Sequence, residues 1–142
     1  MNTNRNAIFR LLITTFFLIS LSSCSQSPEE KLIGEWKGND DTGKSASLVF
    51  NADRSARMIQ GNMVLDGSSL GGKVTWELDA SHDPMHLDLV MTMTSGDTKR
   101  LPFIVRLLGD KILQARIGED SSKRPIAFSE NKDINQIILE RQ

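Results

Sequence analysis

The chain of 142 residues has one cysteine, Cys24, and no tyrosine. A single cysteine excludes an intrachain disulfide, although exported proteins often use disulfides for stability. Cys24 is therefore a modification site, a free thiol or an intermolecular link. Its position in the sequence, described below, decides among these three uses.

Dense positive charge is also missing from the sequence. Lysine and arginine number 17 against 18 aspartate and glutamate residues, which gives a formal net charge of −1. No basic stripe is present that would neutralise phosphates, so a nucleic acid is not expected as a partner. The sequence also contains no H-E-x-x-H and no Cys–His pairing, and we expect neither enzyme activity nor a cofactor.

No apolar run in the sequence is long enough to span a membrane. The longest run, Leu11–Leu21, is about half of the roughly 20 residues that a spanning helix needs. It follows a polar stretch that carries Arg5 and Arg10, and small residues follow it. This order is typical of a signal peptide, here expected over residues 1–23. Its removal would leave a formal net charge of −3.

The end of this segment carries a short motif. Leu21-Ser22-Ser23-Cys24 resembles the lipobox of bacterial lipoproteins, in which an aliphatic residue and two small residues precede the cysteine. The resemblance implies that Cys24 carries lipid such as palmitate and anchors the protein to a membrane of the cell envelope. In a cell with two membranes, Ser25 after the cysteine implies the outer membrane, facing the periplasm.

Beyond the cysteine, the pattern predicts a short helix and then strands. Ser27 to Glu30 forms a capping box with Pro28 at the first helical position. Apolar and polar residues then alternate, which is typical of strands with one buried face. The expected strands cover residues 33–38, 45–50, 56–61, 73–79, 86–93, 100–108, 111–117 and 135–141. Eight short antiparallel strands favour a closed barrel or a sandwich.

Two positions within this pattern carry more detailed expectations. Pro102 lies inside a predicted strand and cannot donate a ladder hydrogen bond, which predicts a sheet edge or a bulge there. Gly109-Asp110 lies between two predicted strands and indicates a hairpin with a two-residue turn.

Several segments in a fixed order resemble an uncharacterised lipocalin-like domain family of bacterial lipoproteins. The segments are Leu32–Gly38 with its Gly-x-Trp motif, Leu48–Asp53, Val74–Asp79, Pro84–Leu89, Leu108–Leu113, Arg124–Ser129 and Ile138–Arg141. The resemblance implies an eight-stranded antiparallel barrel over residues 31–142, preceded by a lipidated tether and helix start at residues 24–30. The chain departs from the family at Arg54, where a glycine usually follows the aspartate. The family has no established activity to transfer.

The same resemblance assigns structural roles to Trp36 and Arg141. In lipocalin-like barrels the tryptophan of Gly-x-Trp lies at the bottom of the barrel, beneath an arginine from the last strand. Arg141 occupies the matching place in this chain. The contact would be structural, a cation–π pair worth about 0.5–2 kcal/mol.

Two short motifs invite other interpretations. Gly67–Lys73 fits G-x-x-x-x-G-K, but Val74 replaces the required Ser or Thr and a strand is expected next, so a flexible connection is favoured over a P-loop. His82, Asp83, Met85 and His86 offer metal ligands or an acid–base pair. The pattern favours a turn followed by a strand, and no metal site is expected. The acidic doublets Asp40-Asp41 and Glu119-Asp120 are expected to lie in solvated loops.

The sequence leaves two functions open. It favours a non-catalytic structural or protein-interaction module of the envelope with a filled barrel. The alternative is a carrier that binds a small apolar ligand inside the barrel, and an open apolar cavity would support this alternative. The residues expected to line such a cavity share the apolar faces of the strands: Phe50, Trp76, Leu89, Met91 and Phe103.

Overall fold

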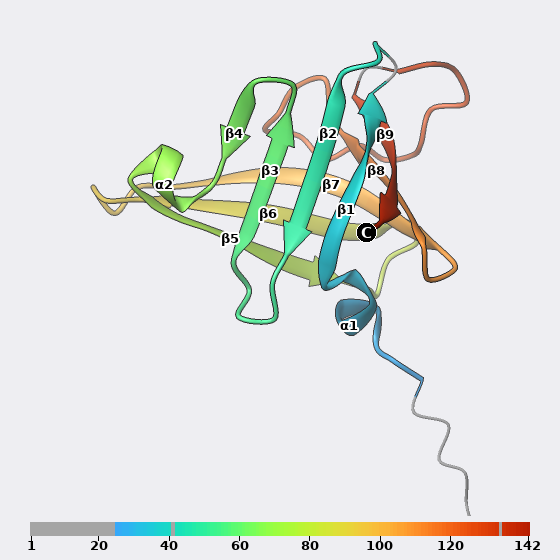
Figure 1. The fold of residues 1–142 in the computed structure, drawn as a ribbon, viewed down its shortest axis with the longest axis horizontal. Coiled ribbons are helices and arrows are strands. Elements are labelled where there is room, and N and C mark those ends of the chain that lie inside the picture. The colour runs from blue at the N-terminus through green and yellow to red at the C-terminus, as the bar shows by residue number, and fades with distance from the viewer. Residues whose placement is uncertain (1–24, 41, 134) are drawn as a thin grey trace, which may run out of the picture.

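The computed structural model describes residues 25–40, 42–133 and 135–142. The expected signal peptide and Cys24 lie outside the described residues. The described part is all-β, a nearly closed antiparallel barrel of nine strands with two short helices (Figure 1). Among the described residues, no helix is long and apolar enough to cross a membrane.

The elements follow the chain in a simple up-and-down order. They are α1 (Pro28–Leu32), β1 (Gly34–Asp40), β2 (Ser45–Phe50), β3 (Ala56–Gln60), β4 (Met63–Leu65), α2 (Gly67–Leu70), β5 (Gly72–Asp79), β6 (Met85–Met93), β7 (Thr98–Leu108), β8 (Ile112–Ile117) and β9 (Gln136–Arg141). The hydrogen-bonded order in the sheet is β4-β3-β2-β1-β9-β8-β7-β6-β5. The last strand therefore pairs with the first, and β4 and β5 are left at the two edges.

The gap between these two edges is partly bridged near the start of β3. The backbone N–H of Trp76 donates to the carbonyl oxygen of Arg54 at 2.9 Å, and Ser55 pairs with Thr75 across the gap. Further along the seam, α2 lies between β4 and β5 in the chain and in Figure 1. The sheet is thus joined at one end of the seam and interrupted by a helix toward the other.

The expectation of eight strands is wrong by one. Each of the eight predicted strands is present within about two residues, and β4 is the additional strand. The Gly109-Asp110 turn is also longer than expected, because Leu108 pairs with Ile112 and leaves three residues between them. Gly109 adopts a φ of 67°, which a three-residue hairpin loop requires at one position.

Pro102 lies in β7 opposite Asp88 of β6. The pairing of β7 with β8 begins only at Phe103, so the stretch that contains Pro102 has a partner on one side. The expected sheet edge is therefore present locally. Proline is tolerated there because no strand on that side would accept a hydrogen bond from the missing N–H. The expected bulge is absent, since the register between β6 and β7 runs without interruption from Met85 to Thr92.

The alternation read from the sequence places one apolar face of each strand inside the barrel. The buried core comprises Leu32, Trp36, Ala46, Leu48, Phe50, Ala56, Val74, Trp76, Leu87, Leu89, Phe103, Val105, Leu113, Ala115 and Leu139. Helix α1 contributes Leu32, which is fully buried against the end of the barrel. The capping box predicted for this helix is present, with Ser27 and Glu30 bonding each other's backbone N–H groups.

Candidate functional site

The barrel core contains a cavity of about 350 Å³ toward the end opposite α1. This volume is in the range of small-molecule pockets. The walls come from β2, β3, β4, β6, β7, β8 and β9: Ala46, Ser47, Leu48, Met58, Ile59, Gln60, Met63, Leu65, Met91, Leu101, Phe103, Ala115, Ile117, Ser121, Asn135 and Ile137. The cavity is partly open, so its apolar walls meet solvent rather than a packed core.

The residues expected to line a cavity divide into two groups. Met91 and Phe103 border the cavity, as expected. Phe50, Trp76 and Leu89 are not among its walls; they are almost fully buried in the closed half of the barrel. There the rings of Phe50 and Trp76 meet edge to face at 5.7 Å, and this packing fills the space.

Charge is absent from the cavity wall formed by the described residues. Its polar residues are neutral, and three of them, Gln60, Ser121 and Asn135, lie in or beside the loops at one end. The side-chain amide of Gln60 donates to Oδ2 of Asp40 at 3.4 Å, which puts a carboxylate behind the wall. An uncharged polar group can bond to such side chains, whereas an anion would be buried without a cation.

Asp40 is held firmly as a carboxylate. It is only 7% exposed and accepts hydrogen bonds from the Thr42 hydroxyl at 2.6 Å and from the backbone N–H groups of Thr42 and Lys44. These bonds, that from the Thr42 hydroxyl above all, lower the pKa of Asp40 to about 2. The carboxylate fixes the turn after β1 beside the cavity. The expectation of a solvated loop at this position is wrong, because Asp40 is buried.

The opposite end of the barrel is closed by Trp36 and Arg141. The guanidinium carbon of Arg141 lies 4.2 Å from the centre of the Trp36 ring, which is the predicted contact. The indole N–H donates to the carbonyl oxygen of Leu32 at 2.8 Å. Arg141 also donates to the carbonyl oxygens of Lys31, Ile33 and Asp110, and so joins α1 and the β7–β8 turn to the last strand.

A second arginine–tryptophan pair lies at the same end, and no motif in the sequence indicated it. Arg54 stacks on Trp76 at 4.3 Å and pairs with Glu29 of α1 at 2.6 Å. Arg54 adopts a φ of 70°, a backbone conformation in which glycine is favoured. Position 54 therefore needs a left-handed backbone conformation, and the arginine side chain supplies contacts that a glycine would lack.

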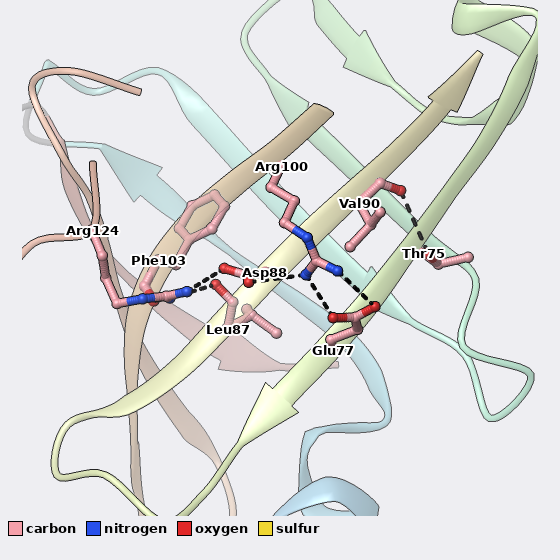
Figure 2. A network of polar contacts seen from close by, with 8 residues as sticks. All are labelled: Thr75, Glu77, Leu87, Asp88, Val90, Arg100, Phe103 and Arg124. Atoms are coloured by element: carbon pink, nitrogen blue, oxygen red, sulfur yellow. Dashed lines mark hydrogen bonds and ion pairs between the residues drawn. The ribbon is translucent and has the colours of Figure 1, made fainter. Parts of the chain in front are cut away.

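The outer face of β5, β6 and β7 carries a chain of charged contacts (Figure 2). Arg100 bonds to Glu77 at 2.6 Å and to Asp88 at 3.2 Å. Arg124, from the segment after β8, pairs with the other oxygen of Asp88 and donates to the carbonyl oxygens of Leu87 and Phe103. These contacts hold the long segment between β8 and β9 against the outside of the barrel.

The group of possible metal ligands seen in the sequence is only partly assembled. His82 and His86 stack with ring centres 3.8 Å apart. Asp83 instead faces Arg106 at 3.5 Å, and Met85 packs against the core. The carboxylate that joins the histidines is Asp79, which the sequence analysis did not select. Asp79 lies directly opposite His86 in the paired strands, and both residues are on the outer faces of their strands. A correct prediction of this pairing could have identified Asp79 from the sequence.

The glycine-rich segment Gly67–Lys73 does not form a phosphate-binding loop. Its first part is the one-turn helix α2, capped by Asp66, and strand β5 follows directly. The sequence predicted a connection followed by a strand that begins near Lys73, and strand β5 confirms this prediction. Part of this connection is a helical turn, in which Asp66 and Ser69 bond each other's backbone N–H groups in a capping box.

Comparison with known proteins adds no assignment to this geometry. No protein-family model matches the chain, and no solved structure matches it significantly. The function is therefore inferred from the residues of the chain itself.

Proposed function

We propose that the protein is a lipid-anchored binding protein of the cell envelope that holds one small, uncharged, apolar molecule in its barrel. The observation that carries the proposal is the partly open apolar cavity of about 350 Å³. Apolar walls that meet solvent are unfavourable, and an apolar molecule that covers them removes their surface from water and gains dispersion contacts. The sequence favoured a filled barrel, and the cavity supports the alternative that the sequence left open.

The chemistry of the wall supports an uncharged ligand. Among the described residues, neither lysine nor arginine borders the cavity, and the Asp40 carboxylate lies behind Gln60. A fatty-acid carboxylate beside Gln60 would find no cation in the wall and would be repelled by the Asp40 carboxylate behind it, which is unfavourable. A long-chain alcohol, a monoacylglycerol or an isoprenoid could place its apolar part against the methionines and its polar end near Gln60 or Asn135.

The lipid anchor and the lipocalin-like family remain parts of this proposal. The anchor is supported by the sequence pattern before Cys24 and by the exposed residues 25–27, which would connect it to α1. The family is supported by the stacking of Arg141 on Trp36 at the closed end. With the anchor attached near α1, the cavity would face away from the membrane surface.

Methionine methyl groups provide the sharpest test of ligand binding. Trp76 is a poor fluorescent reporter of the cavity, because it is buried in the closed half of the barrel. Met58, Met63 and Met91 border the cavity, whereas Met85 packs elsewhere and serves as an internal control. On addition of 1-dodecanol to residues 25–142, we expect the ¹³C-methyl NMR signals of the three cavity methionines to shift with saturation. Dodecanoate should produce much smaller shifts.

A pair of variants provides the control for this titration. Ala115→Leu adds three carbons to the cavity wall, whereas Ala127→Leu adds the same carbons at an exposed position outside the barrel. Binding of 1-dodecanol should weaken at least about tenfold in Ala115→Leu and stay unchanged in Ala127→Leu, because occupied volume excludes the ligand. Equal binding by both folded variants, or no shift in wild type, would leave only the interaction-module function.

The anchor is tested separately. Cys24→Ala should block lipid transfer and leave unprocessed precursor without palmitate label in the producing bacterium. Ser22→Ala keeps a small residue before the cysteine and should be labelled like wild type. Labelling of Cys24→Ala at the wild-type level would remove the lipoprotein proposal and leave the cavity argument intact.

A further inference from the structure

A cluster of three possible metal ligands lies on the outside of the barrel at the β5–β6 hairpin. Asp79 and His86 are cross-strand partners, and His82 lies in the turn between them. Nδ1 of His82 is 3.2 Å from Oδ2 of Asp79, and one ligand atom from each residue lies within 4.8 Å of the other two. Paired strands therefore fix two of the three side chains, and a short turn supplies the third.

We propose that Asp79, His82 and His86 bind one divalent transition-metal ion of the Zn²⁺ type. Two imidazole nitrogens and one carboxylate oxygen are a ligand set that zinc accepts, with a water at the remaining position. Ligand atoms around tetrahedral zinc are about 3.3 Å apart, so the cluster must contract by roughly an ångström or more. The 49% exposed side chain of His82 is free to make this movement.

The His82 ring must turn before both imidazoles can bind one ion. The two imidazole rings lie nearly parallel, with an interplanar angle of 15°. A metal ion lies in the plane of each ring that binds it, so stacked rings cannot share an ion without turning. His86 is fixed within β6, whereas His82 is in the turn. The ion would therefore draw the His82 ring out of the stack and toward Oδ2 of Asp79.

Neighbouring groups hold the other two ligands, Asp79 and His86, in position. Oδ1 of Asp79 accepts hydrogen bonds from the Ser81 hydroxyl at 2.6 Å and from the Ser81 backbone N–H at 3.0 Å, which orients the carboxylate and leaves Oδ2 available. Burial lowers the pKa of His86, and the nearby Arg124 lowers it further. His86 also lies within β6, whose pairing with β5 and β7 holds its backbone in place.

The positive charge of Arg124 near His86 opposes a bound cation, but it is largely engaged. Arg124 pairs with Asp88 and bonds to two backbone carbonyl oxygens. Glu77, also on the outer face of β5, pairs with Arg100. These ion pairs leave the Asp79 carboxylate with His82 as its partner, and a divalent ion would replace that partner with a stronger one.

The test is calorimetric titration of Zn²⁺ into the full chain in a non-chelating detergent. A Cys24→Ser background removes the thiol, which would bind zinc by itself. We expect saturable binding of one ion per chain, weakened at least about tenfold by His82→Ala, His86→Ala or Asp79→Asn. The matched control is Asp120→Asn, because Asp120 makes the same two hydrogen bonds to Ser122 in another turn. That variant should bind zinc like the parent chain.

A second measurement separates loss of the site from loss of the fold. His82 is exposed, so His82→Ala should unfold at the same temperature as the parent without metal. Zn²⁺ should raise the melting temperature of the parent and leave that of His82→Ala unchanged. Unsaturable binding, or equal affinity in His82→Ala and the parent, would overturn the proposal.

Discussion

Gly34 illustrates how one residue is constrained by a side chain from the far end of the chain. Its φ is 136°, and a Cβ at this position would lie 2.8 Å from Nη1 of Arg141. The glycine of the Gly-x-Trp motif is thus required by the arginine that covers the tryptophan. The motif and Arg141 form one structural unit, although Gly34 and Arg141 lie 107 positions apart in the sequence.

This contact predicts that a methyl group at position 34 lowers the free energy of unfolding. Gly34→Ala should destabilise the protein by about 2–4 kcal/mol, because backbone strain and the displacement of Arg141 add together. Gly96 has a φ of 91° and open space around it, so Gly96→Ala reports the strain alone. Urea unfolding of both variants checks the prediction. A cost in Gly34→Ala no larger than in Gly96→Ala would contradict it.

The Trp36–Arg141 pair should be energetically coupled. Trp36→Ala removes a fully buried ring and should destabilise by about 3–5 kcal/mol. Arg141→Ala should destabilise by less, since the side chain is partly exposed. A double-mutant cycle on unfolding free energies should give a coupling of about 0.5–2 kcal/mol. Additive effects would remove the proposed role of Arg141 in covering the tryptophan.

We expect the ionised Asp40 carboxylate to stabilise the folded protein, and this contribution to be lost in acid. Its folded-state pKa is lowered to about 2 from the ordinary 3.8, so the contribution is present above about pH 4 and is lost as the pH falls toward 2. Wild type should therefore be more stable than Asp40→Asn at pH 6, and the difference should shrink at pH 2. Thermal unfolding at several pH values measures this. A difference that does not change between pH 6 and pH 2 would contradict the assignment.

At the scale of elements, the alternation of apolar residues was sufficient to predict most strands. In β6, apolar residues recur at every second position from Met85 to Met93, with Leu87 and Leu89 buried, and Val90 is the one apolar residue on the other face. Strand β4 was not predictable because Met63–Leu65 is three consecutive apolar residues, too short to show a period. Helix α2 was missed because two glycines flank a single turn, whose stability comes from the Asp66–Ser69 cap.

The candidate site was less predictable than the fold. The pattern tells which face of a strand points inward, and Met91 and Phe103 were identified in this way. It does not tell how the interior volume is filled. Phe50 and Trp76 lie on inward faces as well, but their rings occupy the space themselves. The metal cluster likewise depends on the cross-strand register of Asp79 and His86, which follows from a turn whose length the sequence left open.

Arg124 holds the segment between β8 and β9 against the outside of the barrel. Arg124→Ala would leave Asp88 and the carbonyl oxygen of Leu87 without this partner, and we expect a loss of about 1–3 kcal/mol. Backbone amides of residues 118–133 should exchange hydrogen faster in the variant. The matched control is Lys123→Ala, whose side chain is 81% exposed and should change neither quantity. Unchanged exchange in Arg124→Ala would show that other contacts fix the segment.

At the scale of the whole molecule, the two ends of the barrel have different structures. One end is closed by α1 and two arginine–tryptophan pairs, and it is the end nearest the proposed anchor. The other end contains the cavity, bordered by uncharged polar residues in or beside the loops. This asymmetry is what a binding protein tethered at one end requires, because the open end is the one turned toward solvent.

Native mass spectrometry of the protein extracted from its own membrane tests the central claim most directly. Wild type should carry the mass of the lipid on Cys24 together with one small molecule that is released on mild collisional activation. Ala115→Leu should keep the lipid and lose the small molecule, while Ala127→Leu should keep both. A wild-type spectrum that shows lipid alone, identical to that of Ala115→Leu, would contradict a ligand in the barrel.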